Sequence, residues 1–395
     1  MLEWIAALPP DLAWPLVCVL AFALAEWLFR VARIPRISTY ALIGFVLGGA
    51  QLGLLPERPT KAMVLLANIA FGLLLFECGY RINWQWFRRN PWLLLISFLE
   101  SSATLIGVYL VASAAGLGQA QALILGTLAI PTSPATILRV IHETRASGQV
   151  VERLIHFSAL NCIYAVLAFK TIVGYQVFQS SGSLFDALSI SIWVVATSAL
   201  VGLVFGVLVP AMLRWLRRTP NDSDLALVLG LVLAVAIVES LELSSIVVSL
   251  VYGVVARARG VVLGSRHRDF GVLGELLALF LFVFAAASVT VDAVVAGLAL
   301  AIPIMIVRLL ATTAVTTSLA GLSGTTYRKG ALVGLAMAPI SAFVILLLEQ
   351  TPQLGPKLVN QIPALAALVL IMELLGPVLT RLSLHWAGET EERSR

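Results

Sequence analysis

The sequence predicts an all-α polytopic membrane protein with about thirteen transmembrane helices. Hydrophobic residues make up 60% of the 395 residues and charged residues only 12%, a balance that excludes an ordinary soluble domain. Apolar stretches recur along the chain, and each is long enough to cross a hydrocarbon core about 30 Å thick. Of the 26 Lys and Arg residues, all but Lys170 and Arg308 lie between these stretches or within a few residues of their ends. Helices are the expected form, because a lipid-exposed backbone must satisfy its own hydrogen bonds.

The spans follow one another at short intervals. They are expected at residues 12–30, 38–55, 62–80, 91–116, 119–141, 152–177, 185–216, 224–241, 243–257, 269–289, 292–320, 328–349 and 360–384. Cytoplasmic connections of membrane proteins carry an excess of Lys and Arg. If the N-terminus is placed outside, the outer connections hold only Arg58, Lys61 and Lys357, and the inner ones hold nearly all the rest.

This alternation of charge predicts the orientation of the protein. We expect an integral protein of a bacterial inner membrane, with the N-terminus outside and the C-terminus in the cytoplasm. The net charge of +5 then reflects orientation in the lipid bilayer, and no nucleic-acid partner is expected.

Chemistry of the kind found in enzymes has little support in the sequence. Cys18, Cys78 and Cys162 fall within or at the ends of spans, so a disulfide framework is not expected. The four histidines are scattered, and no metal-ligand spacing, phosphate-binding loop or serine nucleophile motif stands out. We therefore expect no enzyme activity, no cofactor and no resident metal.

Two proline-containing segments mark the candidate site. The fifth span contains GTLAIPTSP at Gly126–Pro134, and the twelfth contains GLAMAPIS at Gly334–Ser341. A proline disrupts the helix before it and frees carbonyls and helix ends that can face a polar ligand. Proline is also common in membrane helices generally, so one such segment alone would carry less weight. Because the two segments lie seven spans apart, they run in opposite directions, as in transporters built from inverted repeats.

We therefore expect two inverted repeats, at residues 12–177 and 224–384, joined by the seventh span. The chain forms a single transmembrane domain over residues 1–395. Its two broken helices should be non-helical around Pro131, Pro134 and Pro339, and they should approach each other near the midplane.

Short motifs in this region resemble those of a known family. Thr132-Ser133-Pro134 lies in the fifth span, Asn161-Cys162 in the sixth, and Leu74-Leu75-Phe76-Glu77-Cys78-Gly79 in the third. They resemble the cation/proton antiporter superfamily of sodium/hydrogen exchanger-like proteins. There a Thr-Asp-Pro-type break faces an Asn-Asp or Asp-Asp pair, and exchangers carry a Leu-Phe-Glu-Gly-Gly signature. Arg308 lies where the family keeps a buried cation, and the resemblance extends from about Pro35 to Leu382.

The resemblance implies a sodium/proton antiporter-like fold and a secondary transporter. Core spans at 91–177 and 292–384 would move against scaffold spans at 12–80 and 224–289, and the scaffold would form a homodimer. The transported ions would be a monovalent cation, Na⁺ or K⁺, and the proton, exchanged by alternating access between the broken helices. The implied ion-binding residues are Thr132, Ser133, Asn161 and Cys162.

The chain departs from the family pattern at its acidic positions. The family's carboxylate in the sixth span is Cys162 here, the Asp of the fifth span is Ser133, and the Glu that often precedes the Asn is Phe157. A carboxylate exchanges a cation for protons because it titrates near the working pH. A thiol keeps its proton near neutral pH, so the sequence supports the antiporter fold better than the antiporter chemistry.

Glu100, in the fourth span, is the acidic residue that can replace the missing carboxylates. An isolated carboxylate inside a membrane is costly without a partner, and Arg308 and Lys170 are the cations available within spans. In one interpretation Glu100 and Arg308 form a buried pair that fixes helix register. In the other, Glu100 alternates between Arg308 and a proton or cation.

Two further functions stay open at this point. Lys170 and Arg308 leave the core net positive, which is compatible with transport of an anion or a neutral solute without proton coupling. A degenerate antiporter core could also serve as a non-transporting membrane sensor or partner subunit.

Overall fold

The computed structural model describes residues 10–49, 51–55, 60–82, 84–177, 184–215, 220–261, 271–341, 344 and 363–391. This part of the chain is helical, apart from one antiparallel bridge between Thr132 and Ile340. The helices are, in chain order, α2 (Pro10–Ala32), α3 (Arg36–Leu47), α4 (Lys61–Arg81), α5 (Trp84–Arg89), α6 (Trp92–Ala114), α7 (Gln119–Leu128), α8 (Pro134–Thr144), α9 (Gln149–Val177), α10 (Leu184–Trp215), α11 (Pro220–Ser240), α12 (Ser245–Ala258), α13 (Gly271–Ala287), α14 (Val291–Ser318), α15 (Tyr327–Ala336) and α18 (Pro363–Ala387).

These helices correspond to the predicted spans. Among the described residues, seven helices are long and apolar enough to cross a membrane: α2, α4, α6, α9, α10, α14 and α18. Shorter apolar helices, α3, α12 and α13, occupy the second, ninth and tenth spans, and α11 occupies the eighth. The fifth span is divided into α7 and α8. In the twelfth, α15 ends at Ala336, and most of the C-terminal half of this span lies outside the described residues.

Two local expectations need correction. The second span was expected to continue to residue 55, but α3 ends at Leu47, and a turn follows in which Gly53 adopts a positive φ of 70°. Gly53 permits this turn, because glycine accepts a positive φ at little cost. The sequence reading also missed α5, whose residues WQWFRR combine aromatic and basic side chains as interfacial segments do.

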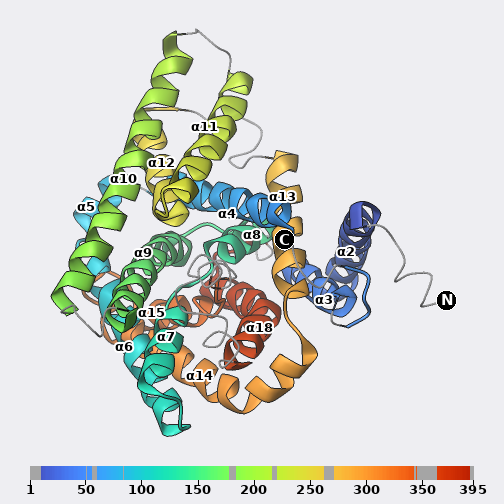
Figure 1. Ribbon diagram of the computed structural model, residues 1–395. Helices are drawn as coiled ribbons and strands as arrows, with labels where there is room; N and C mark the ends of the chain where they lie inside the picture. The colour runs from blue at the N-terminus through green and yellow to red at the C-terminus, as the bar shows by residue number, and fades with distance from the viewer. Residues whose placement is uncertain are drawn as a thin grey trace.

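The helices form two groups (Figure 1). In the first, which we call the crossing bundle, α14 packs on α6, α15 and α18, while α7 packs on α6 and α9. In the second, the scaffold bundle, α4 packs on α12 and α13, and α3 packs on α2 and α13. Helix α10 lies between α9 and α12. The two bundles meet where α4 contacts α8 and where α3 contacts α18.

Glycines bring the scaffold helices close together. A Cβ atom at Gly253 of α12 would lie 2.1 Å from the carbonyl oxygen of Phe76 in α4, and one at Gly79 of α4 would lie 2.2 Å from that of Leu250 in α12. Neither position can hold a side chain without separating the helices. Association through small residues is typical of membrane helices, because it maximises van der Waals contact where lipid provides no hydrophobic drive.

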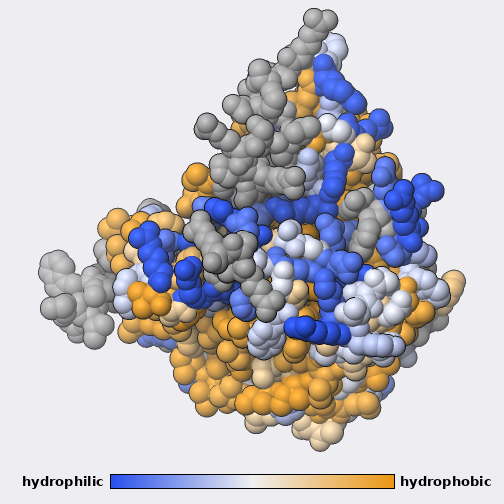
Figure 2. Space-filling model, turned by 180° about the vertical axis from the view of Figure 1, so that it is seen from behind, coloured by the Kyte–Doolittle hydropathy of each residue, from blue (hydrophilic) through white to orange (hydrophobic). Residues whose placement is uncertain are grey.

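Large apolar side chains face outward on both bundles, as in Phe22, Leu110, Trp193 and Leu310. In Figure 2 such side chains cover the lower part of the molecule, whereas hydrophilic side chains gather across the centre of the same face. A membrane protein is expected to expose apolar side chains to lipid and to keep its hydrophilic side chains on the surfaces that face water.

Candidate functional site

The two broken helices meet at the centre of the crossing bundle. Helix α7 ends at Leu128, and α8 does not begin until Pro134. In the extended segment between them, the amide of Ser133 donates to the carbonyl of Pro339 at 2.9 Å. The amide of Ser341 donates to the carbonyl of Pro131 at 3.2 Å. The prediction that both proline segments are non-helical and approach each other is confirmed.

The crossing has internal two-fold character. Ile340, which pairs with Thr132, follows it by 208 residues (340 minus 132). The same spacing separates the two donors of the bridge, and also its two acceptors. Glu100 and Arg308, on α6 and α14, are again separated by 208 residues (308 minus 100), and both are buried. Other buried positions of these helices match with this spacing: Ile96 with Ile304 and Thr104 with Thr312.

Arg308 holds the ends of both broken helices. Its side chain is fully buried; Nε donates to the carbonyl of Ala129 at 2.8 Å, and Nη1 donates to those of Met337 and Ala338 at 2.9 and 2.7 Å. Nη2 donates to the hydroxyl of Thr132 at 3.1 Å. These carbonyls lie at or just beyond the C-terminal ends of α7 and α15, where the helix dipole favours a positive charge. Arg308 therefore satisfies carbonyls that the two breaks leave free.

A polar network extends from Thr132 to α6. The Thr132 hydroxyl accepts from Nδ2 of Asn161 at 3.3 Å and lies 3.4 Å from the carbonyl of Met337. The Oδ1 atom of Asn161 accepts from the hydroxyls of Ser97 at 2.8 Å and Ser101 at 3.2 Å. All of these polar side chains are buried. The network links α6, α9 and the first break.

Ser133 and Cys162 lie at the same crossing with different roles. The hydroxyl of Ser133 accepts from the amide of Thr136 at 3.3 Å and from its hydroxyl at 3.0 Å, and so it caps α8. The thiol of Cys162 lies 3.8 Å from the carbonyl oxygen of Thr132. Pro134 occupies the first position of α8, where a missing amide hydrogen costs nothing.

Glu100 lies beside this network without joining it. The carboxyl group is 1% exposed, and Asn161, Ser101 and Arg308 are near enough to influence its charge. Neither carboxylate oxygen, however, meets hydrogen-bond geometry with a described residue, and no ion pair joins it to Arg308 in that part of the chain. The arrangement is that of a buried carboxyl held next to a cation whose donors are already engaged.

Lys170 does not belong to the crossing. It lies nine residues after Asn161 on α9, which corresponds to about 13 Å along a helix axis. Its side chain is partly exposed, and the carboxylate that influences its charge is Glu242, in the turn between α11 and α12.

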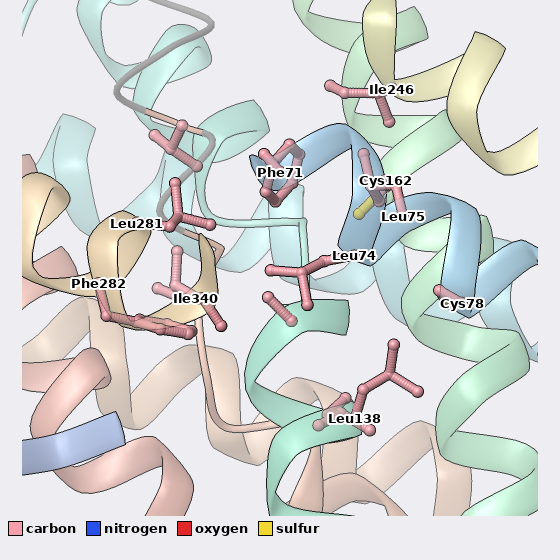
Figure 3. Packing of buried hydrophobic residues seen from close by; sticks show 14 of the residues in the cluster. Phe71, Leu74, Leu75, Cys78, Leu138, Cys162, Ile246, Leu281, Phe282 and Ile340 are labelled. Carbon is pink, nitrogen blue, oxygen red and sulfur yellow. The ribbon is translucent and has the colours of Figure 1, made fainter. Parts of the chain in front are cut away.

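The scaffold bundle presents apolar side chains to the crossing (Figure 3). Phe71 and Leu75 of α4 and Phe282 of α13 belong to one buried apolar cluster that also includes Cys162 and Ile340. The wall opposite the polar network is therefore hydrocarbon-like. No cluster of three or more potential His, Cys, Asp or Glu metal ligands occurs in the described part of the chain.

Comparison with known proteins places this arrangement in a family. A family model described as sodium/hydrogen exchanger, transmembrane, matches residues 18–385. The chain belongs to the sodium/hydrogen exchanger family. Two solved structures are similar in fold, both of the sodium proton antiporter MjNhaP1 from Methanocaldococcus jannaschii. The structure at pH 8 has 17% identity and a TM-score of 0.68 over 98% of each chain, and the electron-microscopy map has 17% identity and 0.72 over 95% of each. No curated protein matches the chain.

Membership of the sodium/hydrogen exchanger family confirms the expected all-helical membrane fold and the class of transporter. The protein is an integral membrane protein of this exchanger family. Of the residues selected from the sequence, Thr132, Ser133, Asn161, Cys162, Glu100 and Arg308 come together at the crossing, together with Pro131, Pro134 and Pro339. Lys170 does not.

A buried acid of this exchanger-family chain, within a predicted span, was not among the predicted site residues. Glu373 of α18 is 1% exposed, and neither of its carboxylate oxygens has a hydrogen-bond partner in the described residues. A signal was present, because Glu373 is a lone acidic residue inside the thirteenth predicted span, and such residues are candidates for function by default. The hydroxyl of Ser341, also buried, lacks a partner there as well.

Proposed function

We propose that this protein exchanges a monovalent cation for protons across the membrane, with Glu100 as the titrating group. One observation carries the proposal: Glu100 is buried beside the hydroxyl and amide oxygens of Ser97, Ser101 and Asn161, and its carboxylate oxygens have no hydrogen-bond partner among the residues that the structure describes. A buried carboxylate without a partner favours its neutral form. It can ionise when a cation takes the place of the proton.

The neighbouring oxygens suit a small monovalent cation. Hard cations prefer oxygen ligands, and Oδ1 of Asn161 lies within hydrogen-bonding distance of two serine hydroxyls. A cation held between the Glu100 carboxylate and these oxygens would compete with the proton for one site. Such competition is sufficient for exchange, provided that the site opens to one side of the membrane at a time.

Arg308 has a positioning role in this proposal. Its donors are engaged by Ala129, Met337, Ala338 and Thr132, so it need not form an ion pair with Glu100. It keeps the two breaks together while Glu100 gains and loses a proton. Cys162 contributes shape and a weak contact to the carbonyl of Thr132, in place of a titrating charge.

The crossing bundle would be the moving part. It contains the site, and beside the crossing it meets the scaffold bundle through apolar side chains of α4 and α13. Ion pairs of α8 with the scaffold, Glu77–His142 and Arg36–Glu143, would have to rearrange as it moves. We also propose that the scaffold bundle forms a homodimer, in a bacterial inner membrane, with the N-terminus outside and the C-terminus in the cytoplasm.

The positions of Lys170 and Arg308 in the fold do not support the alternative function, transport of an anion. That reading relied on Lys170 and Arg308 as free cations of the core. Lys170 lies away from the crossing, and Arg308 is engaged by acceptors of the protein. The buried side chains near the crossing include two carboxyl groups, Glu100 and Glu373, which favour cation chemistry.

Transport by the purified protein in liposomes tests the proposal. A gradient of Na⁺ or K⁺ is imposed, and proton movement is followed with a dye trapped inside. We expect cation-driven proton movement with the unaltered chain and its loss in Glu100→Gln, since the amide keeps the shape and removes the titrating proton. Glu275→Gln, at an exposed glutamate of α13, is the matched control and should transport normally.

Two results would contradict the proposal. Full exchange in Glu100→Gln would assign the proton to another group. Absence of proton movement with every cation, in a folded protein, would favour the sensor or partner-subunit alternative.

A further inference from the structure

Glu373 is a second buried acid for which the proposed exchange has no role. It lies near the middle of α18, one residue before Leu374, whose carbonyl accepts from the Ser38 hydroxyl of α3, and three residues before Gly376, which packs on the second break. Helices α3, α8, α9, α14 and α15 pack on α18. Among the described residues, no charged side chain of these helices or of α18 itself forms a hydrogen bond with Glu373. The charged residues on these helices are Arg36, Arg139, Glu143, Glu152, Arg153, Lys170, Asp292, Arg308, Arg328, Lys329 and Arg381.

Contacts of α18 place Glu373 next to the second break. The hydroxyl of Thr380 donates to the carbonyl of Ala336 at 2.9 Å, and a Cβ at Gly376 would lie 2.7 Å from the Cα of Pro339. The two chains are therefore antiparallel here. Glu373 precedes Gly376 by three residues, which places it on the same helix face, about one turn further along.

The extended segment after Pro339, which contains Ser341, lies at the same level along α18 as Glu373. The Ser341 hydroxyl is fully buried and has no hydrogen-bond partner among the described residues. Its counterpart across the internal two-fold, Ser133, uses its hydroxyl to cap α8. The second break therefore holds a buried hydroxyl and a buried carboxyl on neighbouring elements, and neither has a hydrogen-bond partner in the part of the chain that the structure describes.

The internal two-fold gives these groups a counterpart. Helix α18 follows the second break as α9 follows the first. In the first repeat, α9 directs Asn161 at the break, and Glu100 lies beside it. In the second repeat, α18 carries Glu373 to the corresponding region. Within the described ranges, each repeat thus brings to the crossing a buried carboxyl group that has no hydrogen-bond partner there.

We propose that Glu373, with the hydroxyl of Ser341 beside it, is a second proton-binding site of the transport cycle. This inference rests on the proposed exchange at Glu100. Both carboxyl groups take up a proton on one side of the membrane, and both release it on the other, where one monovalent cation binds. With Arg308 included, the cation-loaded crossing carries no net charge and the proton-loaded crossing carries one positive charge. Two protons then move against each cation, and the exchange transfers charge.

The ratio of protons to cations moved by the unaltered chain tests this second site directly, and we expect two protons per cation. In proteoliposomes held at zero membrane potential, a fixed Na⁺ gradient is opposed by pH gradients of increasing size until proton movement stops. In Glu373→Gln, the pH gradient that balances a given Na⁺ gradient should be twice that of the unaltered chain. Glu373→Asp retains a titrating proton and should keep the original balance point. Glu275→Gln is again the matched control.

The outcomes separate this inference from the proposed function. Exchange by the unaltered chain that balances at one proton per Na⁺ would overturn the second site and leave the Glu100 site in place. An unchanged balance point in a folded Glu373→Gln protein would overturn it equally. Absence of proton movement driven by either Na⁺ or K⁺, in a folded protein, would overturn both.

Discussion

Arg308 and Glu100 should differ sharply in what they contribute to stability. Arg308→Met removes every donor to the carbonyls of Ala129 and Ala338, whereas Met337 keeps a contact with the Thr132 hydroxyl. Two buried acceptors without partners cost about 1–3 kcal/mol each, so we expect a loss of about 2–6 kcal/mol. Part of this is offset, because a guanidinium group no longer has to be buried.

Glu100→Gln should behave in the opposite way. Neither oxygen of Glu100 has a hydrogen-bond partner among the described residues, so the amide removes no hydrogen bond and adds no volume. We expect a change in unfolding free energy within about 1 kcal/mol. Thermal unfolding of the purified variants in one detergent measures both effects. Arg308→Lys should fall between them, because it keeps the charge and loses the planar array of donors.

A buried ion pair would give a different pattern. If Glu100 and Arg308 depended on each other, Glu100→Gln would leave an unpaired cation and cost about 3–5 kcal/mol. The double variant Glu100→Gln/Arg308→Gln would then recover much of that loss. Equal destabilisation by the two single changes, with recovery in the double variant, would refute the assignment of Arg308 to the helix ends.

Two further changes test other parts of the crossing bundle. Cys162→Asp places a carboxylate where the thiol now lies 3.8 Å from the carbonyl of Thr132, so it should strengthen Na⁺-driven proton movement in proteoliposomes; unchanged transport by a folded variant would count against a cation at this position. Glu389→Gln weakens a contact in which the carboxylate accepts from the amides of Val150 and Val151 and from Lys329 at 2.9–3.1 Å. Because charged caps stabilise helix N-termini, the melting temperature should fall by an amount equivalent to about 1–2 kcal/mol, without a change in the proton-to-cation ratio. A stability equal to that of the unaltered chain would show that this cap is dispensable.

The membrane-spanning pattern could be predicted from the sequence because it has few solutions. An apolar run of hydrocarbon length must form a helix that satisfies its own backbone, and the charged residues between runs mark its ends. The paired proline segments were informative for a related reason. Pro15, Pro210, Pro303 and Pro377 all lie within continuous helices, so proline alone does not determine a break. It was the repetition of one short motif in two oppositely directed spans that indicated the crossing.

The partners of the buried charges could not be predicted from the sequence. Spacing along a helix fixes the depth and face of a side chain, which is why Glu100 and Arg308 could be assigned to the core. It does not say whether a guanidinium group will meet a carboxylate or carbonyls freed by a break. Only the packing of α14 against both breaks decides that Arg308 bonds to backbone oxygens.

Tertiary structure likewise separated Lys170 from the site and added Glu373 to the buried groups near it. Both are single ionisable residues within apolar spans, so their local sequences look alike. Lys170 lies near the turn that carries Glu242 and is partly exposed, whereas Glu373 lies beside the second break and is buried. Apolar length and proline position are properties of one segment and can be read from it. The environment of a charge depends on segments hundreds of residues away, which come together only in the folded chain.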